Sequence, residues 1–381
     1  MDLSAIKSRI GKYLGSLSQL NKTEGWGPIK SVSTYFDYFG AYVKHGCLID
    51  QYINGKFYTY RNYYRKRIIT QRRLDEIIRI ANKPDGIHLL ENKADFNRHF
   101  SKWVKRGWAF SETMTLDDFS ALCKTCKYLF VKPLDSYEGK GIERIETPAD
   151  EESIRRLYDK LKGGRFIIEQ ELKQHPGMIF GNKSVNTLRI NTLLDRYGNV
   201  HIFKPVLRTG VGDAVVDNYN AGGVEYAVDT ETGIITMPGY SQGIMKEIYH
   251  PGTDIKMVGY QIPMWKEVIE TVTQAARHIP QCRYIGWDVA ITPDGIEFIE
   301  GNHNPGYVCM EYFGETGWYG KLKKYLSADL HESIRQPSNS IITPPPPISK
   351  MLVINILQHV KASDAEYYNL QYTDFLMKSA A

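Results

Sequence analysis

The segment that decides the fold reads Tyr284-Ile-Gly-Trp-Asp-Val-Ala-Ile-Thr-Pro-Asp-Gly-Ile-Glu-Phe-Ile-Glu-Gly-Asn-His-Asn-Pro-Gly306. In its first half, apolar residues alternate with other residues, which is the period of a β-strand with one buried face. Residues 293–295 read Pro-Asp-Gly and predict a three-residue hairpin loop, with glycine at the position that needs a positive φ. The segment therefore predicts two antiparallel strands joined by a tight turn.

The predicted register of this hairpin brings three oxygen-bearing side chains together. A three-residue loop pairs Thr292 with Ile296, and the same register sets Asp288 directly opposite Glu300. Asn302 lies two residues further along the second strand, on the same face as Glu300. Two carboxylates and an amide oxygen form an oxygen-only set that suits Mg²⁺. The alternative is a polar strand face turned to water, but the glycine- and proline-bearing backbone after Asn302 favours a site.

The bulk composition is that of an ordinary globular protein. The 381 residues are 42% hydrophobic and 24% charged, and this length favours two or three subdomains over a single core. The net charge of +5 is small against 48 basic and 43 acidic residues. It mildly favours anionic ligands and does not argue for nucleic acid.

Neither a membrane span, nor a cysteine-based metal site, nor a disulfide framework is predicted from the sequence. No apolar run reaches the roughly 18 residues that a membrane helix needs, and the first residues lack the apolar stretch of a signal peptide. The five cysteines are an odd number, and Cys123-x-x-Cys126 is a lone pair without a second pair or a nearby histidine. This pattern does not favour zinc or redox use. We expect a reduced, cytoplasmic protein.

Four regions are expected along the chain. Residues 1–90 are rich in Tyr, Lys and Arg, and we expect a largely helical region there. Residues 91–172 and 173–330 are expected to form two subdomains that mix helices and strands. In residues 331–381 a proline run at 344–347 predicts a stiff break before a C-terminal tail that docks on the body or on a neighbour.

An aromatic and cationic stretch runs from Tyr35 to Arg67. Interleaved aromatic and basic side chains can stack on nucleic-acid bases or on sugars. They also occur where helices cover a core with long side chains whose charged ends reach water. The helical spacing of apolar residues continues from Leu74 to Ile80, and this continuation favours packing over nucleic-acid binding.

A candidate phosphate site follows the predicted strand Leu129–Pro133. Lys132 ends this strand, and residues 136–141 form a polar loop with two glycines. Glycine lets backbone N–H groups approach an anion closely, and lysine supplies a point charge. The loop is not a Walker motif, and many such hairpins bind nothing. Downstream, the apolar strand 166–172 ends in acceptor groups, which suits either a purine and ribose site or an ordinary polar turn.

Two arginines lie within apolar strand patterns, Arg189 and Arg208. An unpaired guanidinium in such a place is costly, so each must meet a carboxylate or a phosphate. Structural ion pairs are the alternative to ligand contacts. The segment 217–223, Asp-Asn-Tyr-Asn-Ala-Gly-Gly, reads as a glycine-bearing loop near a site.

In their order along the chain, these motifs resemble the ATP-grasp superfamily over about residues 85–325. The matching positions are Lys93, Lys132 with its loop, residues 169–172, Asn186, Arg189, Arg208, Asp288, Glu300 and Asn302. The similarity is greatest to the sugar-transfer-associated ATP-grasp group, in Ser184–Arg189, Arg208–Gly210 and 217–223. The resemblance implies an α+β fold of two subdomains that clasp ATP, preceded by a mostly helical region.

The resemblance also implies how the nucleotide is held. ATP phosphates would be contacted by Lys93, Lys132 and the loop residues Ser136, Gly139, Lys140 and Gly141. The adenine and ribose would face Glu169, Gln170, Glu171 and Leu172. Asp288, Glu300 and Asn302 would hold two Mg²⁺ ions, with Mn²⁺ as an alternative. The loop Ser-Tyr-Glu-Gly-Lys-Gly has fewer small residues than is usual in ATP-grasp ligases, so its phosphate contacts stay open.

On the acceptor side, the resemblance implies that Arg189 and Arg208 are catalytic, with Arg189 on the transferred phosphoryl group. Substrate contacts would come from Asn186, Asn218, Gly222, Gly223 and His303. His303 is either an acceptor-side base or a structural hydrogen-bond partner.

Three functions compete. The first is an ATP-dependent carboxylate–amine ligase in cell-surface polysaccharide or peptide-like metabolite synthesis, a setting that rests on analogy. The second is a kinase of a sugar-like hydroxyl, and the third is a non-catalytic nucleotide-binding protein, against which the intact metal set argues. The expected partners are small-molecule or saccharide carboxylates and amines, and a homo-oligomer remains open.

Overall fold

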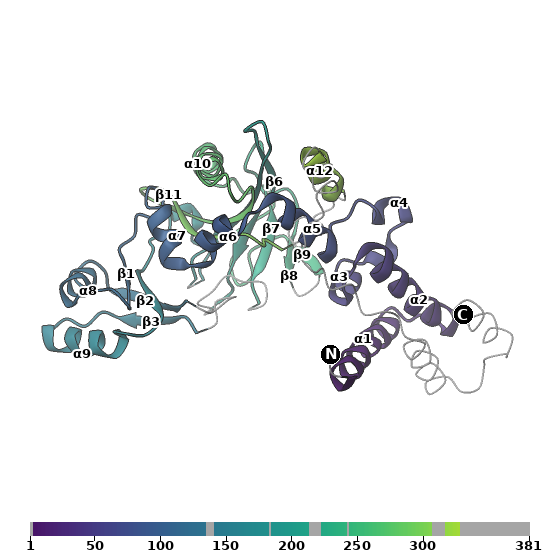
Figure 1. Ribbon diagram of the computed structural model, residues 1–381, viewed down its shortest axis with the longest axis horizontal. Coiled ribbons are helices and arrows are strands. Elements are labelled where there is room, and N and C mark those ends of the chain that lie inside the picture. The colour runs from purple at the N-terminus through teal and green to yellow at the C-terminus, as the bar shows by residue number, and fades with distance from the viewer. Residues whose placement is uncertain are drawn as a thin grey trace. The chain divides into compact units, whose positions relative to one another are not determined.

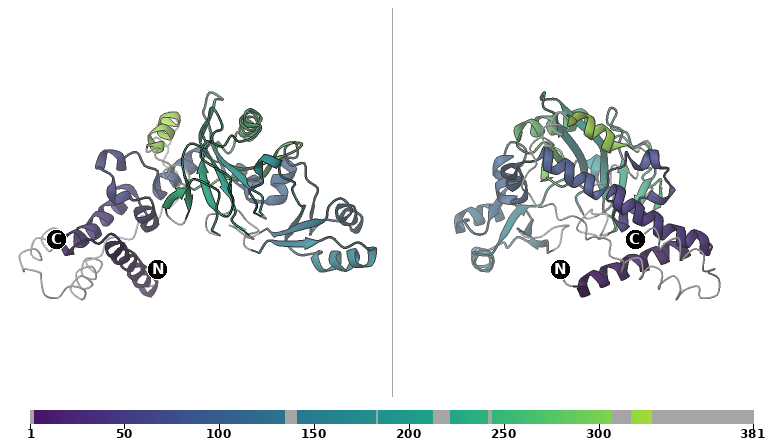
Figure 2. Two further views of the ribbon diagram at one scale, coloured as in Figure 1. Left: turned by 180° about the vertical axis from the view of Figure 1, so that it is seen from behind. Right: turned by 45° about the vertical axis from the view of Figure 1, so that its right-hand side comes forward.

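The computed structural model describes residues 3–134, 141–182, 184–212, 222–241, 244–306 and 317–327 (Figures 1 and 2). These residues divide into two compact units, 3–75 and 76–327. The first unit is helical, and the second contains two antiparallel sheets. The mixed α+β class and the helical N-terminal region expected from the sequence are both confirmed.

Two long helices and several short ones make up the first unit. They are α1 (Leu3–Thr23), α2 (Pro28–His45), α3 (Ile49–Asn54), the 3-10 helix η1 (Phe57–Thr59), α4 (Asn62–Arg65) and the start of α5 (Gln71–Ala81). Helix α2 begins with proline at its first position, where no N–H is needed. It ends at His45, and Gly46 caps it with a φ of 67°, the left-handed conformation that glycine adopts readily.

The aromatic stretch of this unit is mostly internal. Tyr35, Tyr38, Tyr52 and Phe57 are buried against leucines of α1, so packing is confirmed for these side chains. Tyr63 and Tyr64 differ, because they are 58% and 45% exposed.

The smaller sheet of the second unit has four antiparallel strands in the order β1-β4-β2-β3. Its strands are β1 (Trp108–Phe110), β2 (Tyr128–Pro133), β3 (Glu143–Glu146) and β4 (Phe166–Gln170). Helices α8 (Leu116–Cys123) and α9 (Glu151–Leu161) pack on this sheet through a shared apolar cluster (Figure 1). The side chains of Thr115 and Asp150 accept hydrogen bonds from the first turns of α8 and α9, which fixes where each helix begins.

A seven-stranded antiparallel sheet forms the rest, with the order β11-β10-β5-β6-β7-β8-β9. Its strands are β5 (Thr187–Leu194), β6 (Val200–Thr209), β7 (Val224–Ala227), β8 (Gly239–Ser241), β9 (Ile244–Glu247), β10 (Tyr284–Thr292) and β11 (Gly295–Asn302). The helical elements of this part are α6 (Pro84–Glu91), α7 (Lys93–His99), η2 (Pro176–Met178), α10 (Trp265–His278) and α12 (Trp318–Tyr325).

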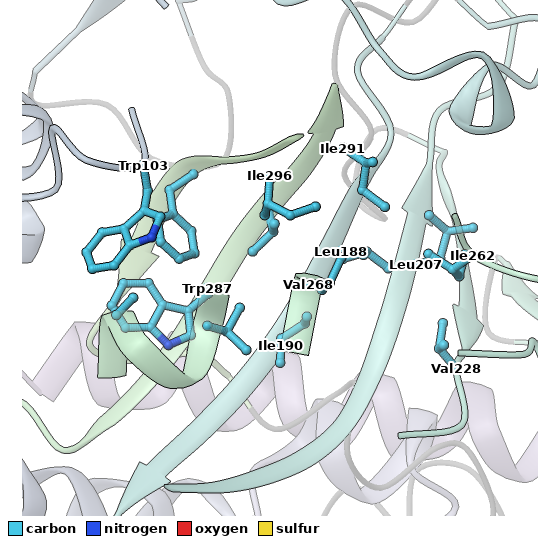
Figure 3. Close-up of a cluster of buried hydrophobic side chains, with 14 of the residues drawn as sticks. Trp103, Leu188, Ile190, Leu207, Val228, Ile262, Val268, Trp287, Ile291 and Ile296 are labelled. Atoms are coloured by element: carbon cyan, nitrogen blue, oxygen red, sulfur yellow. The ribbon is translucent and has the colours of Figure 1, made fainter. Parts of the chain in front are cut away.

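The largest core lies on one face of the seven-stranded sheet. Leu188, Ile190 and Trp287 point into it, together with Val268 of α10 and Trp103 (Figure 3). Because side chains alternate along a strand, the residues between these core positions lie on the opposite face. We call this opposite face, which carries Arg189, Asn191, Asp288 and Glu300, the site face.

The loop of the β10–β11 hairpin differs from the sequence prediction. Thr292 pairs with Gly295 and Ile291 with Ile296, so the predicted pairing of Thr292 with Ile296 was wrong. The Thr292 hydroxyl donates to the Gly295 carbonyl at 2.8 Å and accepts from the Asp294 amide at 3.2 Å. These bonds close the turn around two residues rather than three.

The pairing that matters is nevertheless the predicted one. Val289 pairs with Phe298, and the next pair along the ladder is Asp288 with Glu300. This shift is a β-bulge, in which one strand contributes an extra residue. The bulge offsets the shorter loop by one position, and it returns Asp288 and Glu300 to opposite places.

Candidate functional site

The predicted oxygen-bearing residues meet at the end of the hairpin. Asp288 is 7% exposed and lies opposite Glu300, while Asn302 Nδ2 donates to Glu300 Oε1 at 3.1 Å. Burial raises the pKa of Glu300, and the charge of Asp288 and a hydrogen bond with it raise the pKa further. Two acidic groups are thus held closer together than their charges favour.

Both predicted arginines lie on the same site face. Arg189 pairs with Asp288 across β5 and β10, and Nε and Nη2 of Arg189 hold the two oxygens of that carboxylate, the second at 2.8 Å. Arg208 Nη1 lies 3.6 Å from Asp288 Oδ1, and its Nε lies 3.3 Å from Glu225 Oε1. Each guanidinium thus meets a carboxylate, one of the two kinds of partner expected from the sequence.

These contacts set the charge state of Asp288. Its burial would raise the pKa, but the charge and hydrogen bonds of Arg189, followed by the charge of Arg208, lower the pKa to about 2. Asp288 is therefore ionised at neutral pH. Arg189 Nη1 also donates to the Pro305 carbonyl at 3.0 Å, which ties the guanidinium to the segment after β11.

The donor set suits a hard cation in its chemistry. Among the described residues no group of three or more His, Cys, Asp or Glu side chains is placed to hold a metal ion. The candidate set has two carboxylates, and its third member is the amide of Asn302. A carboxylate has about four acceptor positions, so Asp288 can bind Arg189 and retain acceptor capacity for a cation. Oxygen donors of this kind fit Mg²⁺.

Two lysines flank the predicted phosphate loop. Lys93 begins α7, and its Nζ donates to the carbonyls of Pro133 and Leu134 at 3.1 and 3.2 Å. Lys132 is the second-last residue of β2, and its Nζ contacts Glu169 Oε2. Of the loop, Ser136, Gly139 and Lys140 lie outside the described residues. Gly141 begins the next described segment with a φ of 73°.

The predicted adenine segment lies at the end of β4 and has protein partners for its polar side chains. Glu169 is 3% exposed and accepts from Asn97, Arg106 and Lys132. Glu171 accepts from Arg144 at 2.7 Å, and the Gln170 carboxamide contacts the Gly107 amide and Thr125. Leu172 follows the strand and is half-buried. The side chains of Glu169 and Gln170 thus hold protein groups together.

A comparison with known families shows the family of the chain. The model of a family described as sugar-transfer associated ATP-grasp matches residues 72–325, more than half of the 381 residues. The chain belongs to the sugar-transfer associated ATP-grasp family.

Solved ATP-grasp structures are similar to the chain at low identity. The ATP-grasp ligase PsnB, solved with a minimal precursor, is 15% identical with a TM-score of 0.41, covering 65% of this chain and 64% of PsnB. D-alanyl-alanine synthetase A from Vibrio cholerae is 16% identical with a TM-score of 0.41, covering 65% and 68%. An L-amino acid ligase from Bacillus licheniformis is 15% identical with a TM-score of 0.39, covering 66% and 52%. The chain thus spans less than two thirds of PsnB. A search of curated proteins found no match.

The residues predicted to contact the acceptor lie in different settings in this ATP-grasp protein. Asn186 is fully buried, and its carboxamide bonds to Asn182, the Met178 carbonyl and the Gly210 amide. His303 Nε2 lies 3.1 Å from Glu91 Oε1. Gly222 and Gly223 begin a described segment, with a φ of 87° at Gly222, and Asn218 lies outside the described residues.

Sequence reasoning missed a buried charged group beside Glu169, one of the predicted nucleotide-binding residues. Arg106 and Glu297 form an ion pair of 3.0 Å in which both side chains are almost fully buried. Glu297 is charged and stands within a strand of buried residues. The argument applied to Arg189, that a buried charge needs a partner, would have singled it out.

No helix among the described residues is long and apolar enough to cross a membrane.

Proposed function

We propose that this ATP-grasp protein is an ATP-dependent carboxylate–amine ligase that forms an amide through an acyl phosphate and releases ADP. The observation that carries the proposal is the site face itself, where Asp288 and Glu300 lie opposite each other beside two arginines. The arrangement concentrates anionic cation ligands and fixed positive charge on one surface. Phosphoryl transfer needs both.

The nucleotide would lie between polar groups of one sheet and polar groups of the other. Lys93 and Lys132 would contact its phosphates, together with Ser136, Gly139, Lys140 and Gly141, and the end of β4 would face the base and ribose. Asp288, Glu300 and Asn302 would hold two Mg²⁺ ions, or Mn²⁺, which neutralise phosphate charge when bound. Asn186, Asn218, Gly222, Gly223 and His303 would border the acceptor. Because Asn186 is satisfied within the protein, we assign it the shaping of that border.

The reaction proceeds in two steps. A carboxylate oxygen of the substrate attacks the γ-phosphorus of ATP, the bond to the bridging oxygen breaks, and ADP leaves. An amine then attacks the acyl carbon, phosphate leaves, and the nitrogen loses a proton. Arg189, Arg208 and Lys132 offset the negative charge that develops on the transferred group. Positioning and electrostatics suffice, and no covalent enzyme intermediate is needed.

The substrates would be a small-molecule or saccharide carboxylate and an amine. The description of the family as associated with sugar transfer supports a role in cell-surface polysaccharide or peptide-like metabolite synthesis. A cytoplasmic location is part of this proposal, because ATP is supplied there.

Hydroxylamine trapping tests the proposal. The protein is incubated with ATP, Mg²⁺, hydroxylamine and panels of amino acids and uronic acids, and both ADP and hydroxamates are measured. A carboxylate that gives ADP and a hydroxamate in equal amounts supports the ligase. A phosphorylated sugar without any hydroxamate would establish the kinase instead.

The variant Glu300→Gln tests whether the cation site is needed for turnover. The substitution keeps the size of the side chain but removes one charge from the cation site, and we expect turnover to fall about 100-fold or more. Glu152→Gln on α9 is the control, because that side chain is 80% exposed and lies on the other subdomain. Equal turnover in both variants would refute the metal assignment.

A further inference from the structure

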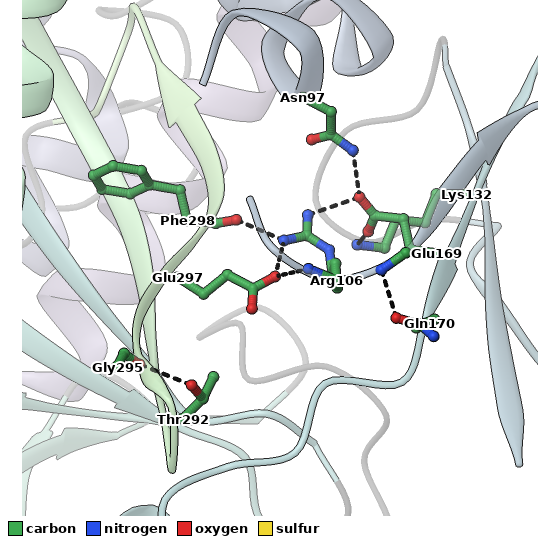
Figure 4. Close-up of polar contacts among 10 residues, drawn as sticks. Asn97, Arg106, Lys132, Glu169, Gln170, Thr292, Gly295, Glu297 and Phe298 are labelled. Atoms are coloured by element: carbon green, nitrogen blue, oxygen red, sulfur yellow. Dashed lines mark hydrogen bonds and ion pairs between the residues drawn. The ribbon is translucent and has the colours of Figure 1, made fainter. Parts of the chain in front are cut away.

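Arg106 lies at the centre of a buried network that connects the two sheets (Figure 4). Its Nη2 donates to Glu169 Oε1 on β4 at 2.7 Å. Its Nη1 donates to Glu297 Oε1 at 3.0 Å and to the Phe298 carbonyl at 2.7 Å, both on β11. The Arg106 backbone amide also donates to Glu297 Oε1 at 3.0 Å. One side chain therefore bonds to a strand of each subdomain.

The network reaches the site at both of its ends. At one end, Glu169 Oε2 holds the Nζ of Lys132, the predicted phosphate ligand on β2. At the other end, Glu297 stands on β11 three residues before Glu300, on the strand that carries the predicted metal ligands. Arg106 thus links Lys132 to β11 through three successive contacts, Lys132–Glu169, Glu169–Arg106 and Arg106–Glu297.

The degree of burial separates the members of this network. The side chains of Arg106, Glu169 and Glu297 are 4%, 4% and 7% exposed, whereas that of Lys132 is 17% exposed. The three buried groups are out of reach of a ligand in bulk solvent. Lys132 is the member through which the network can meet a nucleotide.

We propose that Arg106 is a positioning residue for the nucleotide: it holds the Glu169 carboxylate so that the Lys132 ammonium lies at a fixed place relative to β11. Asn97 donates to the same oxygen of Glu169 at 2.9 Å, which further limits the rotation of the Glu169 carboxylate. Because Arg106 and Asn97 share this carboxylate, Lys132 does not hold it alone, and its charge stays available to a phosphate. The inference rests on the proposed function. It assigns to Arg106 the alignment of the two sides of the ATP site.

Arginine is suited to this task for a geometric reason. The guanidinium is planar and carries donors in a fixed fork, so one side chain can bond to two carboxylates and a carbonyl in different directions. A lysine at position 106 would keep the charge but offer a single nitrogen. We expect Arg106→Lys to fold, because the charge is retained, and to lose the alignment.

A double-mutant cycle with Lys132 tests the proposal, using MgATP as the probe and calorimetric titration as the measurement. We expect Arg106→Lys and Lys132→Met each to raise the Kd for MgATP by about tenfold or more. If Arg106 acts through Lys132, the double variant binds MgATP no more weakly than Lys132→Met alone. A structural role unrelated to the lysine predicts instead that the two losses add.

Two further variants keep the test decisive. Arg65→Lys is the matched control, because Arg65 makes two bonds of 2.6 and 2.7 Å to Asp37 in the first unit, and its Kd for MgATP should equal that of the wild type. If Arg106→Lys does not fold, Glu297→Gln enters the cycle in its place, with the same expected non-additivity.

The outcomes separate the inference from the function. Additive losses, an unchanged Kd in the Arg106 variant, or an unchanged Kd in Lys132→Met would each overturn the positioning role while leaving the ligase proposal standing. Wild-type protein that does not bind MgATP would contradict the ligase proposal itself.

Discussion

Two groups of buried charge in the second unit, one centred on Glu169 and one on Asp288, differ in how their carboxylates are balanced. Around Glu169, burial would raise the pKa, but Arg106 and Lys132 outweigh it and hold the pKa well below its usual range. Around Asp288, Arg189 and Arg208 have the same effect. The neighbouring Glu300, however, has a raised pKa, because it is buried next to another carboxylate.

The difference shows in which group the protein balances its carboxylates with its own cations. Glu169 and Glu297 face Arg106 and Lys132, so two negative charges meet two positive charges at hydrogen-bond distances. On the site face, the carboxylates of Asp288 and Glu300 lie opposite each other, and the two arginines contact Asp288. We interpret the Glu169 group as a structural support and the Asp288 group as a place prepared for a ligand of positive charge.

Glu169→Gln should have the largest effect on stability. The substitution leaves Arg106 and Lys132 facing a neutral amide in a buried place, and breaking one side of such a pair costs about 3–5 kcal/mol. The free energy of unfolding, measured by urea titration, reports the loss. A loss below about 1 kcal/mol would be that of a surface ion pair, and it would contradict the contrast between the Glu169 group and the Asp288 group.

Gly286→Ala should have an intermediate effect, on the site face. A Cβ at this position would lie 2.4 Å from Pro305 Cβ and 2.7 Å from Asn191 Oδ1, so the segment that bonds to Arg189 must shift. Overpacking of this kind costs about 1–3 kcal/mol. Gly320→Ala is the control, because a Cβ there meets no atom within 4 Å. Unfolding midpoints that move alike in both variants would count against the close packing.

Glu171→Gln should have the smallest effect. Glu171 lies two residues after Glu169 and is paired with Arg144, but both side chains are more than a third exposed. Partly exposed pairs of this kind contribute about 0–1 kcal/mol. The same urea titration should give a loss within that range, and a loss equal to that of Glu169→Gln would show that burial is not the deciding factor.

The site face was predictable because its signals are local. The strand period and the turn residues place Asp288 opposite Glu300 from a segment of about twenty residues. The predicted loop was one residue too long, and the bulge between Val289 and Asp288 compensated for it. A bulge has no reliable signature in one sequence, so the correct pairing was reached with an incorrect turn.

The Glu169 group was not predictable in the same way. The partners of Arg106 are 63 and 191 residues away in sequence. They meet because β4 of one sheet and β11 of the other both come within hydrogen-bond distance of Arg106. Sequence reasoning can show that Glu297 needs a partner. It cannot show which arginine supplies it, since the choice depends on the tertiary arrangement.

The most direct test of the cation site is the Mg²⁺ dependence of ATP binding. ATP is titrated calorimetrically into wild-type protein and Glu300→Gln, each with Mg²⁺ and with EDTA. The proposal predicts that Mg²⁺ strengthens ATP binding to the wild type and that Glu300→Gln loses most of this gain. Equal strengthening in both proteins would show that Glu300 does not hold the ion, and it would contradict the assignment of the Asp288, Glu300 and Asn302 set.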